Sequence, residues 1–232
     1  MRNFTIRILL LKVILFIALA QTTSAQNTIL VGLNGGLSVP SGEYAGTTLN
    51  KDGFAQLGVS FGADVVWFFS KHIGVAAAIN QSNNPIDVTT LTTERLKADP
   101  FLQELSIRSE SFTNTTITAG IYGRWTFGDN FSFYGKLMAG WIRSQTPYQL
   151  YRTSYFQLGP TYYEITSSLD DAFVVIPGIG GMYLFKRGLG VKFDIDYTGR
   201  TMTFPFQTSS GMRYDERQVH YTQIMLGVVV SF

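Results

Sequence analysis

The sequence predicts an all-β protein: an eight-stranded antiparallel up-and-down transmembrane β-barrel with short periplasmic turns and long extracellular loops. Eight segments of about ten or more residues alternate between apolar and polar or small side chains, which is the length a tilted strand needs to cross a bilayer. The connections between these segments are alternately short and long. Only 15% of the residues are charged while 14% are aromatic, which is a low charge content for a soluble domain.

The first 25 residues have the pattern of a cleaved secretory signal peptide. A start with three basic residues leads into an unbroken apolar run over residues 13–20, and the small residue Ala25 precedes the expected cleavage point. A membrane-anchoring helix is the alternative, but Lys12 interrupts the apolar stretch, which falls short of the roughly 20 residues a spanning helix needs. We therefore expect a signal peptide over residues 1–25 and an outer-membrane β-barrel domain over residues 26–232.

Charge and composition exclude several classes of function. Loss of the signal peptide removes three basic residues and no acidic one, so the formal charge changes from +2 to about −1. The basic pI then belongs to the precursor, and with no Lys/Arg run in residues 26–232 we expect no nucleic-acid partner. Cys is absent and His occurs twice, which excludes a His/Cys metal site. We expect no cofactor and no resident metal.

The predicted strands follow from the two-residue alternation. They cover residues 28–39, 55–69, 73–82, 117–127, 131–141, 173–185, 189–200 and 221–232. Tight turns are expected at 70–72, 128–130 and 186–188, and long loops at 41–53, 83–113, 145–171 and 201–218. An even strand number with short turns at one end fits a closed barrel with both termini in the periplasm, because hydrocarbon tolerates no open sheet edge.

The apolar faces of these strands carry large aromatic residues near the strand ends. Aromatic girdles at the two water interfaces are typical of membrane barrels. A soluble β-sandwich or a lipocalin-like barrel is the alternative, and there the apolar faces would point inward; the Gly- and Ser-rich opposite faces favour a crowded interior instead. The predicted girdle consists of Trp67, Phe69, Trp125, Phe127, Phe131, Trp141, Tyr183, Phe185 and Phe232.

The opposite faces place a balanced set of charges inside the barrel. Because buried charges are tolerated only when they are paired, this set predicts an ion-pair network that fills a narrow lumen. A gated polar path for protons or ions is the alternative for the same residues. The predicted network consists of Asp64, Arg124, Lys136, Lys192, Asp194 and Asp196.

Two of the long loops contain further predicted features. Residues 92–105 form a short amphipathic helix interrupted at Pro100, and residues 147–166 form a hairpin that extends the strands beyond the membrane. Tyr offers a large contact area at low entropy cost, so the hairpin is a candidate contact surface; positions in the headgroup belt or packing against other loops are the alternative. Its tyrosines are Tyr148, Tyr151, Tyr155, Tyr162 and Tyr163.

One pair of residues in the last strand suggests chemistry. His220 and Thr222 lie two apart on the predicted lipid-facing side, with Glu216 nearby, an arrangement similar to that of some outer-membrane lipid deacylases, which use a His and a Ser. A nucleophile needs a base within hydrogen-bond reach, and an interfacial histidine is the alternative. We therefore expect no catalytic residues and keep a lipid-modifying enzyme as a minor alternative.

The first strand and loop, VGLNGGLSVPSGEY, and the terminal segment IMLGVVVSF resemble the outer-membrane β-barrel domain family of small eight-stranded proteins, of the PorT-like and OmpA/OmpX-type kind. The resemblance implies an integral outer-membrane protein that contacts outer-membrane lipid and lipopolysaccharide. A last strand ending in Phe232 implies recognition by the barrel-assembly machinery. We expect a non-enzymatic barrel that acts through its extracellular loops or in an envelope or secretion assembly with a protein partner; a narrow channel for small hydrophobic or ionic solutes is the alternative.

Overall fold

The computed structural model describes residues 28–128, 130–156, 159–185, 188–208 and 211–232. The expected signal peptide over residues 1–25 lies outside the described residues. Among the described residues, no helix is long and apolar enough to cross a membrane.

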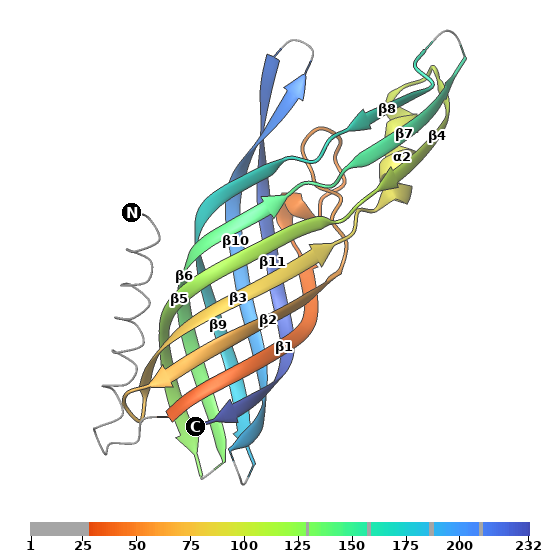
Figure 1. Cartoon of the computed structure of the whole chain (residues 1–232). Helices are drawn as coiled ribbons and strands as arrows, with labels where there is room; N and C mark the ends of the chain where they lie inside the picture. Colours follow the sequence, from red (N-terminus) through yellow and green to blue (C-terminus); the bar gives the residue numbers. More distant parts are fainter. Residues whose placement is uncertain (1–27, 129, 157–158, 186–187, 209–210) are drawn as a thin grey trace.

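Eight antiparallel strands form a closed barrel (Figure 1). The ring closes where the first strand pairs with the last, with Leu33 opposite Val228, so every strand has two neighbours. This confirms the predicted fold and the strand order of an up-and-down barrel. The strands are β1 (Thr28–Pro40), β2 (Gly58–Phe68), β3 (Ile73–Asn84), β5 (Phe112–Phe127), β6 (Phe131–Gln145), β9 (Leu169–Leu184), β10 (Leu189–Thr208) and β11 (Gly211–Ser231).

The outer connections contain a second, smaller sheet. Strands β4 (Leu102–Ser109), β7 (Gln149–Tyr155) and β8 (Tyr162–Ile165) pair antiparallel in the order β4-β7-β8. Helix α2 (Val88–Ala98) precedes β4 and packs against it, and the short 3-10 helix η2 (Gly42–Tyr44) follows β1. The hairpin predicted over 147–166 is therefore present as β7 and β8, with β4 as a third strand that the alternation did not reveal.

Two predictions for the outer connections are wrong in detail. The helix begins at Val88, where the Asp87 side chain accepts a hydrogen bond from the Thr90 amide (3.0 Å), and it ends before Pro100 because proline cannot continue a helix. The second half of the predicted helix is strand β4. Residues 201–218 are mostly not a loop: β10 and β11 stay paired out to Thr208 opposite Gly211. These strands form a long hairpin, which leaves the same end of the barrel as the small sheet and diverges from it (Figure 1).

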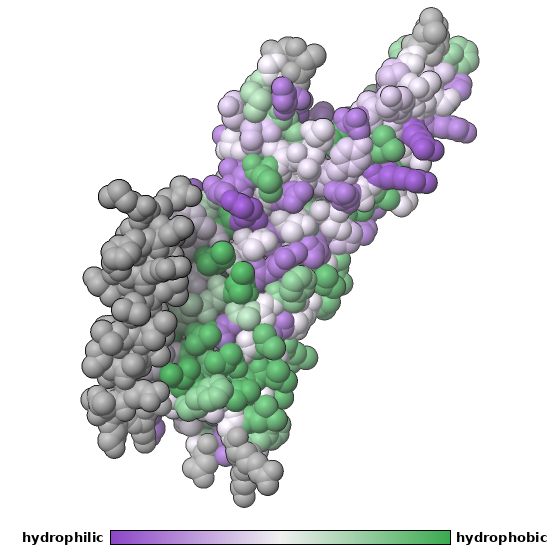
Figure 2. Space-filling view, in the orientation of Figure 1, coloured by the Kyte–Doolittle hydropathy of each residue, from purple (hydrophilic) through white to green (hydrophobic). Residues whose placement is uncertain are grey.

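Alternation along each strand separates a buried inner face from an exposed apolar outer face. On β11, Met225 and Val229 are buried while Leu226 is 68% exposed. In Figure 2 apolar surface covers the half of the barrel near the short turns, and polar surface gathers above it. A large exposed apolar surface belongs against lipid. The band identifies the membrane-spanning part of the barrel.

Candidate functional site

Five buried charged residues meet inside the barrel. Lys136 Nζ lies 2.5 Å from Asp194 Oδ1 and 2.9 Å from Asp196 Oδ1. Lys192 pairs with Asp64 and lies 3.5 Å from Asp194 Oδ2. β2, β6 and β10 supply these residues from opposite parts of the wall, and each side chain is at most 7% exposed. We call Asp64, Lys136, Lys192, Asp194 and Asp196 the lumen network.

Neighbouring polar groups add one hydrogen bond to each of two of its carboxylates, while Asp194 Oδ2 accepts none among the described residues. The Tyr134 hydroxyl donates to Asp194 Oδ1 (3.0 Å), and Asn34 Nδ2 donates to Asp64 Oδ1 (2.7 Å). Two cavities beside the network have volumes of about 10 Å³ each, which leaves room for one water molecule at most. The lumen is therefore filled at this level, as expected for eight strands.

Arg124 was predicted to belong to this network, and that prediction is wrong. Its guanidinium lies 3.9 Å from the centre of the Phe68 ring, and its Nε donates to the carbonyl of Lys71 (3.3 Å). Both partners are at the periplasmic end of β2. Arg124 has the inward orientation that the alternation predicts, but it lies nearer the short turns than the network. On β5 it is Tyr122 that lies opposite Lys136, whereas Arg124 lies opposite Tyr134. A cation–π contact and a backbone carbonyl replace the carboxylate there.

A second layer closes the outer mouth of the barrel. Tyr44, from η2, is only 2% exposed and packs edge-on against Phe112 with ring centres 5.1 Å apart. Asn114 Nδ2 donates to its hydroxyl (3.1 Å), and Ser144 Oγ donates in turn to Asn114 Oδ1 (2.7 Å). The connection after β1 therefore folds back into the barrel. Sequence reasoning missed Tyr44 because it lies in a loop without periodicity.

The wall between β9 and β10 is paired over only part of its length. The ladder runs from Gly190 opposite Leu184 to Asp196 opposite Gly178. It stops next to Pro177, which has no N–H to donate. Further out, the Thr203 amide donates to Asp170 Oδ2 (2.7 Å) and side chains tie the two strands again. We call residues 172–177 and 197–202 the unpaired stretch, because they form no ladder with each other although they remain paired with β6 and β11, respectively.

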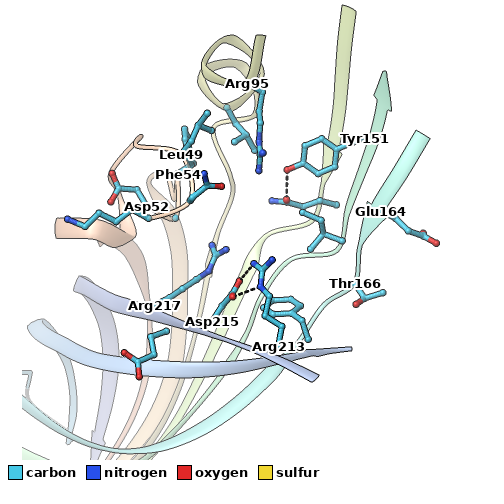
Figure 3. A pocket seen from close by; sticks show the side chains of 18 of the residues that line it. Leu49, Asp52, Phe54, Arg95, Tyr151, Glu164, Thr166, Arg213, Asp215 and Arg217 are labelled. Carbon is cyan, nitrogen blue, oxygen red and sulfur yellow. Dashed lines mark hydrogen bonds and ion pairs between the residues drawn. The ribbon is translucent and has the colours of Figure 1, made fainter. Parts of the chain in front are cut away.

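An open cavity lies outside the barrel, between the small sheet and the β10–β11 hairpin (Figure 3). Its volume is about 480 Å³. Arg95 reaches into it from α2, Tyr151 from β7, and Arg217 from β11, while Leu49 and Phe54 line the opposite wall. We call this the outer cavity, and we call α2, β4, β7, β8 and the described residues 203–208 and 211–216 together the outer platform.

The five tyrosines of the 147–166 hairpin do not form one surface. Tyr151 is 1% exposed and stacks on Tyr163 with ring centres 4.5 Å apart. The prediction that Tyr151 offers a contact surface is therefore wrong, because it faces the platform core. Tyr162 is 65% exposed. Tyr148 donates to Glu164, and Tyr155 and Tyr163 are partly buried.

Comparisons with solved structures identify the architecture. The chain is 9% identical to the outer-membrane protein AlkL, with a TM-score of 0.53, covering 91% of this chain and 93% of AlkL. Its fold is that of small outer-membrane β-barrels. The chain is also similar to Ail from Yersinia pestis, with 15% identity and a TM-score of 0.46 over 90% of this chain and 100% of Ail. It is similar to OprG from Pseudomonas aeruginosa, with 12% identity and a TM-score of 0.47 over 90% of this chain and 96% of OprG. No protein-family model and no curated protein sequence matches the chain.

The aromatic residues mark the two edges of this outer-membrane barrel. All nine predicted girdle residues lie on outward faces or at strand ends, and all but Trp141 gather near the periplasmic turns, where Phe131 and Phe133 pack edge-on at 4.7 Å. Trp141 packs against Phe173 at the outer edge (5.9 Å). From residue 131 to residue 141, at ~3.3 Å per residue and a tilt of about 40°, β6 spans roughly 25 Å, the height of the apolar band of such barrels.

A charged pair follows directly outside this edge. Arg143 and Asp171, each two residues beyond Trp141 and Phe173, form two hydrogen bonds of 2.7 and 2.8 Å in solvent. Asp171 holds the pKa of Arg143 above its usual value by this hydrogen bond. The outer boundary of the membrane therefore lies between these two pairs of residues, and the outer platform stands entirely in the aqueous phase.

His220 lies at the same outer edge. Its Nδ1 is 3.2 Å from the Tyr197 hydroxyl, and the two rings pack edge-on. Thr222 also faces outward, two residues further along β11 toward the membrane-spanning part. No hydrogen bond joins it to His220 in the part of the chain that the structure describes. The geometry thus makes His220 part of the aromatic edge and assembles no base–nucleophile pair there.

Proposed function

We propose that this outer-membrane barrel is a closed, non-enzymatic scaffold that acts through its outer platform, by holding a partner or ligand of the cell envelope outside the membrane. One observation carries the proposal. The lumen network and Tyr44 fill the barrel, whereas its strands continue past the membrane edge into a folded platform with a cavity of about 480 Å³. A concave site with a few converging polar groups is the usual form of a binding site.

Shortening the β10–β11 hairpin should remove this function and leave the barrel intact. Replacing residues 204–215 by Asn-Gly joins Thr203 to Glu216, which are directly opposite each other, through a favoured two-residue turn. Tagged full-length protein should recover a stoichiometric envelope partner from gently solubilised membranes, and the shortened protein should not.

The control for this experiment is the barrel itself. Both proteins should migrate as compact, heat-modifiable species on a cold gel, because the membrane-spanning pairs are unchanged. Equal recovery of the partner by the two proteins would contradict a role for the outer platform, and recovery by neither would favour a stand-alone barrel.

A second function is supported by the unpaired stretch. An interrupted ladder in hydrocarbon leaves backbone groups unpaired at a cost, and irregular backbone at membrane depth is tolerated where it is buried in protein or lines a cavity. The inner faces of the two segments carry buried apolar side chains, among them Val174, Ile176 and Met202. We infer a lateral passage for small apolar molecules as the second candidate.

Pro177→Val tests this passage. Valine restores an N–H and favours strand structure, so the ladder with β10 should lengthen. Cells that produce the variant should take up the apolar fluorophore pyrene more slowly than cells that produce the wild type. Pro160→Val, at the exposed tip of the outer platform, is the matched control and should not change uptake. Equal uptake with all three proteins would exclude the passage.

A further inference from the structure

Most charged groups that line the outer cavity already have a partner. Arg213 forms two hydrogen bonds with Asp215 (2.7 and 2.6 Å), and Lys51 pairs with Glu43 (3.0 Å). Asp52 accepts a hydrogen bond from the Thr48 amide (2.8 Å), and Glu164 accepts one from Tyr148. Glu216 is exposed on the outward face of β11. The acidic groups of the lining are therefore engaged elsewhere or turned away.

Two guanidinium groups remain, those of Arg95 and Arg217. Neither has an acidic partner at ion-pair distance among the residues that the structure describes. The Nε of Arg95 is buried without a hydrogen-bond acceptor, and the guanidinium group has a hydrogen bond to the neutral hydroxyl of Tyr151 as its neighbouring contact. Arg217 is partly buried, and burial lowers its pKa, with Asp215 opposing this shift. Burying a cation is costly unless an anion accompanies it.

The two groups face the same cavity. Burial raises the pKa of Tyr151 to about 12, and the positive charges of both Arg95 and Arg217 act against that shift. Arg95 extends from α2 on one side of the cavity, next to Tyr151, and Arg217 extends from β11 on the other side (Figure 3). Two cations held apart by separate elements and facing one space form a clamp for an anion.

We propose that the outer cavity binds a phosphoryl group between Arg95 and Arg217. Guanidinium groups bind phosphate oxygens through paired hydrogen bonds. The Tyr151 hydroxyl already donates its proton to Gln149 Oε1 (2.7 Å), so it forms part of the cavity wall and the two guanidinium groups supply the donors. Leu49, Phe54 and Leu91 also line the cavity, so part of the space beside the clamp is apolar. The inference rests on the proposed function, because it assigns a ligand class to the platform that acts.

Two sources supply this chemistry at the cell surface. One is a soluble phosphorylated molecule, and the other is the phosphorylated headgroup of lipopolysaccharide. The cavity lies in the aqueous phase just beyond the membrane edge, within reach of both, and the experiment below separates them.

Calorimetric titration of the whole barrel with inorganic pyrophosphate tests the clamp. In nanodiscs of zwitterionic lipid the wild type should bind, and Arg95→Gln and Arg217→Gln should each weaken binding about tenfold or more, the effect of losing one charge-assisted hydrogen bond. Arg152→Gln removes the same charge from an exposed position on β7 outside the cavity, and it should change affinity less than about twofold.

The outcomes that overturn the proposal are distinct. Absence of pyrophosphate binding by the wild type overturns it, as does equal weakening by Arg152→Gln and Arg95→Gln, which would indicate general charge attraction. Heat-modifiable migration of each variant shows that the barrel is folded. If pyrophosphate does not bind but hairpin shortening still abolishes partner recovery, the clamp fails and the proposed function stands.

A second set of nanodiscs identifies the source. If the clamp holds a lipopolysaccharide headgroup, included lipopolysaccharide competes with pyrophosphate for the site. The apparent affinity of the wild type for pyrophosphate should then fall at least about fivefold. The affinity of Arg152→Gln should fall by the same factor. Unchanged affinity assigns the clamp to a soluble phosphorylated ligand. Either result requires the binding seen in zwitterionic lipid to depend on Arg95 and Arg217.

Discussion

Replacing Lys136 with methionine should destabilise the barrel by about 3 to 5 kcal/mol. The substitution keeps the volume and removes the charge that lies 2.5 Å from Asp194 and 2.9 Å from Asp196. Lys192 remains, but it is already shared between Asp64 and Asp194. Asp196 then has no cation at hydrogen-bond distance, in an interior where water cannot replace it.

Urea unfolding in lipid vesicles, followed by tryptophan fluorescence, measures this effect. Lys97→Met is the matched control, since Lys97 forms an ion pair of 2.7 Å with Glu94 on the exposed side of α2, and such pairs contribute about 0 to 1 kcal/mol. Adding Asp194→Asn and Asp196→Asn to Lys136→Met should restore much of the stability, because it removes the uncompensated charges. Equal stability of Lys136→Met and Lys97→Met would show that the lumen network is not a structural plug.

Gly120→Val should cost at least about 3 kcal/mol and prevent most of the protein from reaching the folded barrel. Gly120 faces inward on β5, and a Cβ there would lie 2.1 Å from the carbonyl oxygen of Leu137 and 2.7 Å from the Cα of Met138. Both atoms belong to the backbone of β6. No rotamer change can relieve the overlap, so the two strands would have to move apart and lose their ladder.

Gly135→Val is the control for this prediction. Gly135 lies on the outward face of β6, and a Cβ there meets nothing within 4 Å, so valine would only add an apolar side chain to the lipid face. The heat-modifiable fraction on a cold gel should fall sharply for Gly120→Val and stay near the wild-type value for Gly135→Val. Similar fractions for the two variants would contradict the close approach of β5 and β6.

Much of the barrel could be predicted from the sequence, because a strand has an intrinsic period of two. That period assigns Asp64, Lys136 and Asp194 to one inner face without any knowledge of pairing. It does not assign their height in the barrel, which depends on the stagger between neighbouring strands. Arg124 was misplaced for this reason: it lies on the same inner face as the lumen network but at a different position along the barrel axis, nearer the short turns.

The outer platform was harder to predict. Strand β4 pairs with β7 across a separation of about forty residues, with Ile107 opposite Tyr151. No short turn connects the two strands, so the sequence gives no local signal that they pair. Arg95 and Arg217 belong to a helix and to a segment predicted as a loop, so no common periodicity links them. Only the folded arrangement of the strands brings these two side chains to one cavity.

The closure of the ring has a consequence for biogenesis. Phe232 exchanges backbone hydrogen bonds with Ile29 (2.9 and 3.2 Å), so the first strand gains its second partner only when the last residue is in place. Contacts between such distant parts of a chain form slowly, since loop closure costs entropy before any pairing is gained. Until then the polypeptide carries unpaired strand edges that promote aggregation. Its safe passage across the periplasm therefore depends on being kept unfolded until insertion begins.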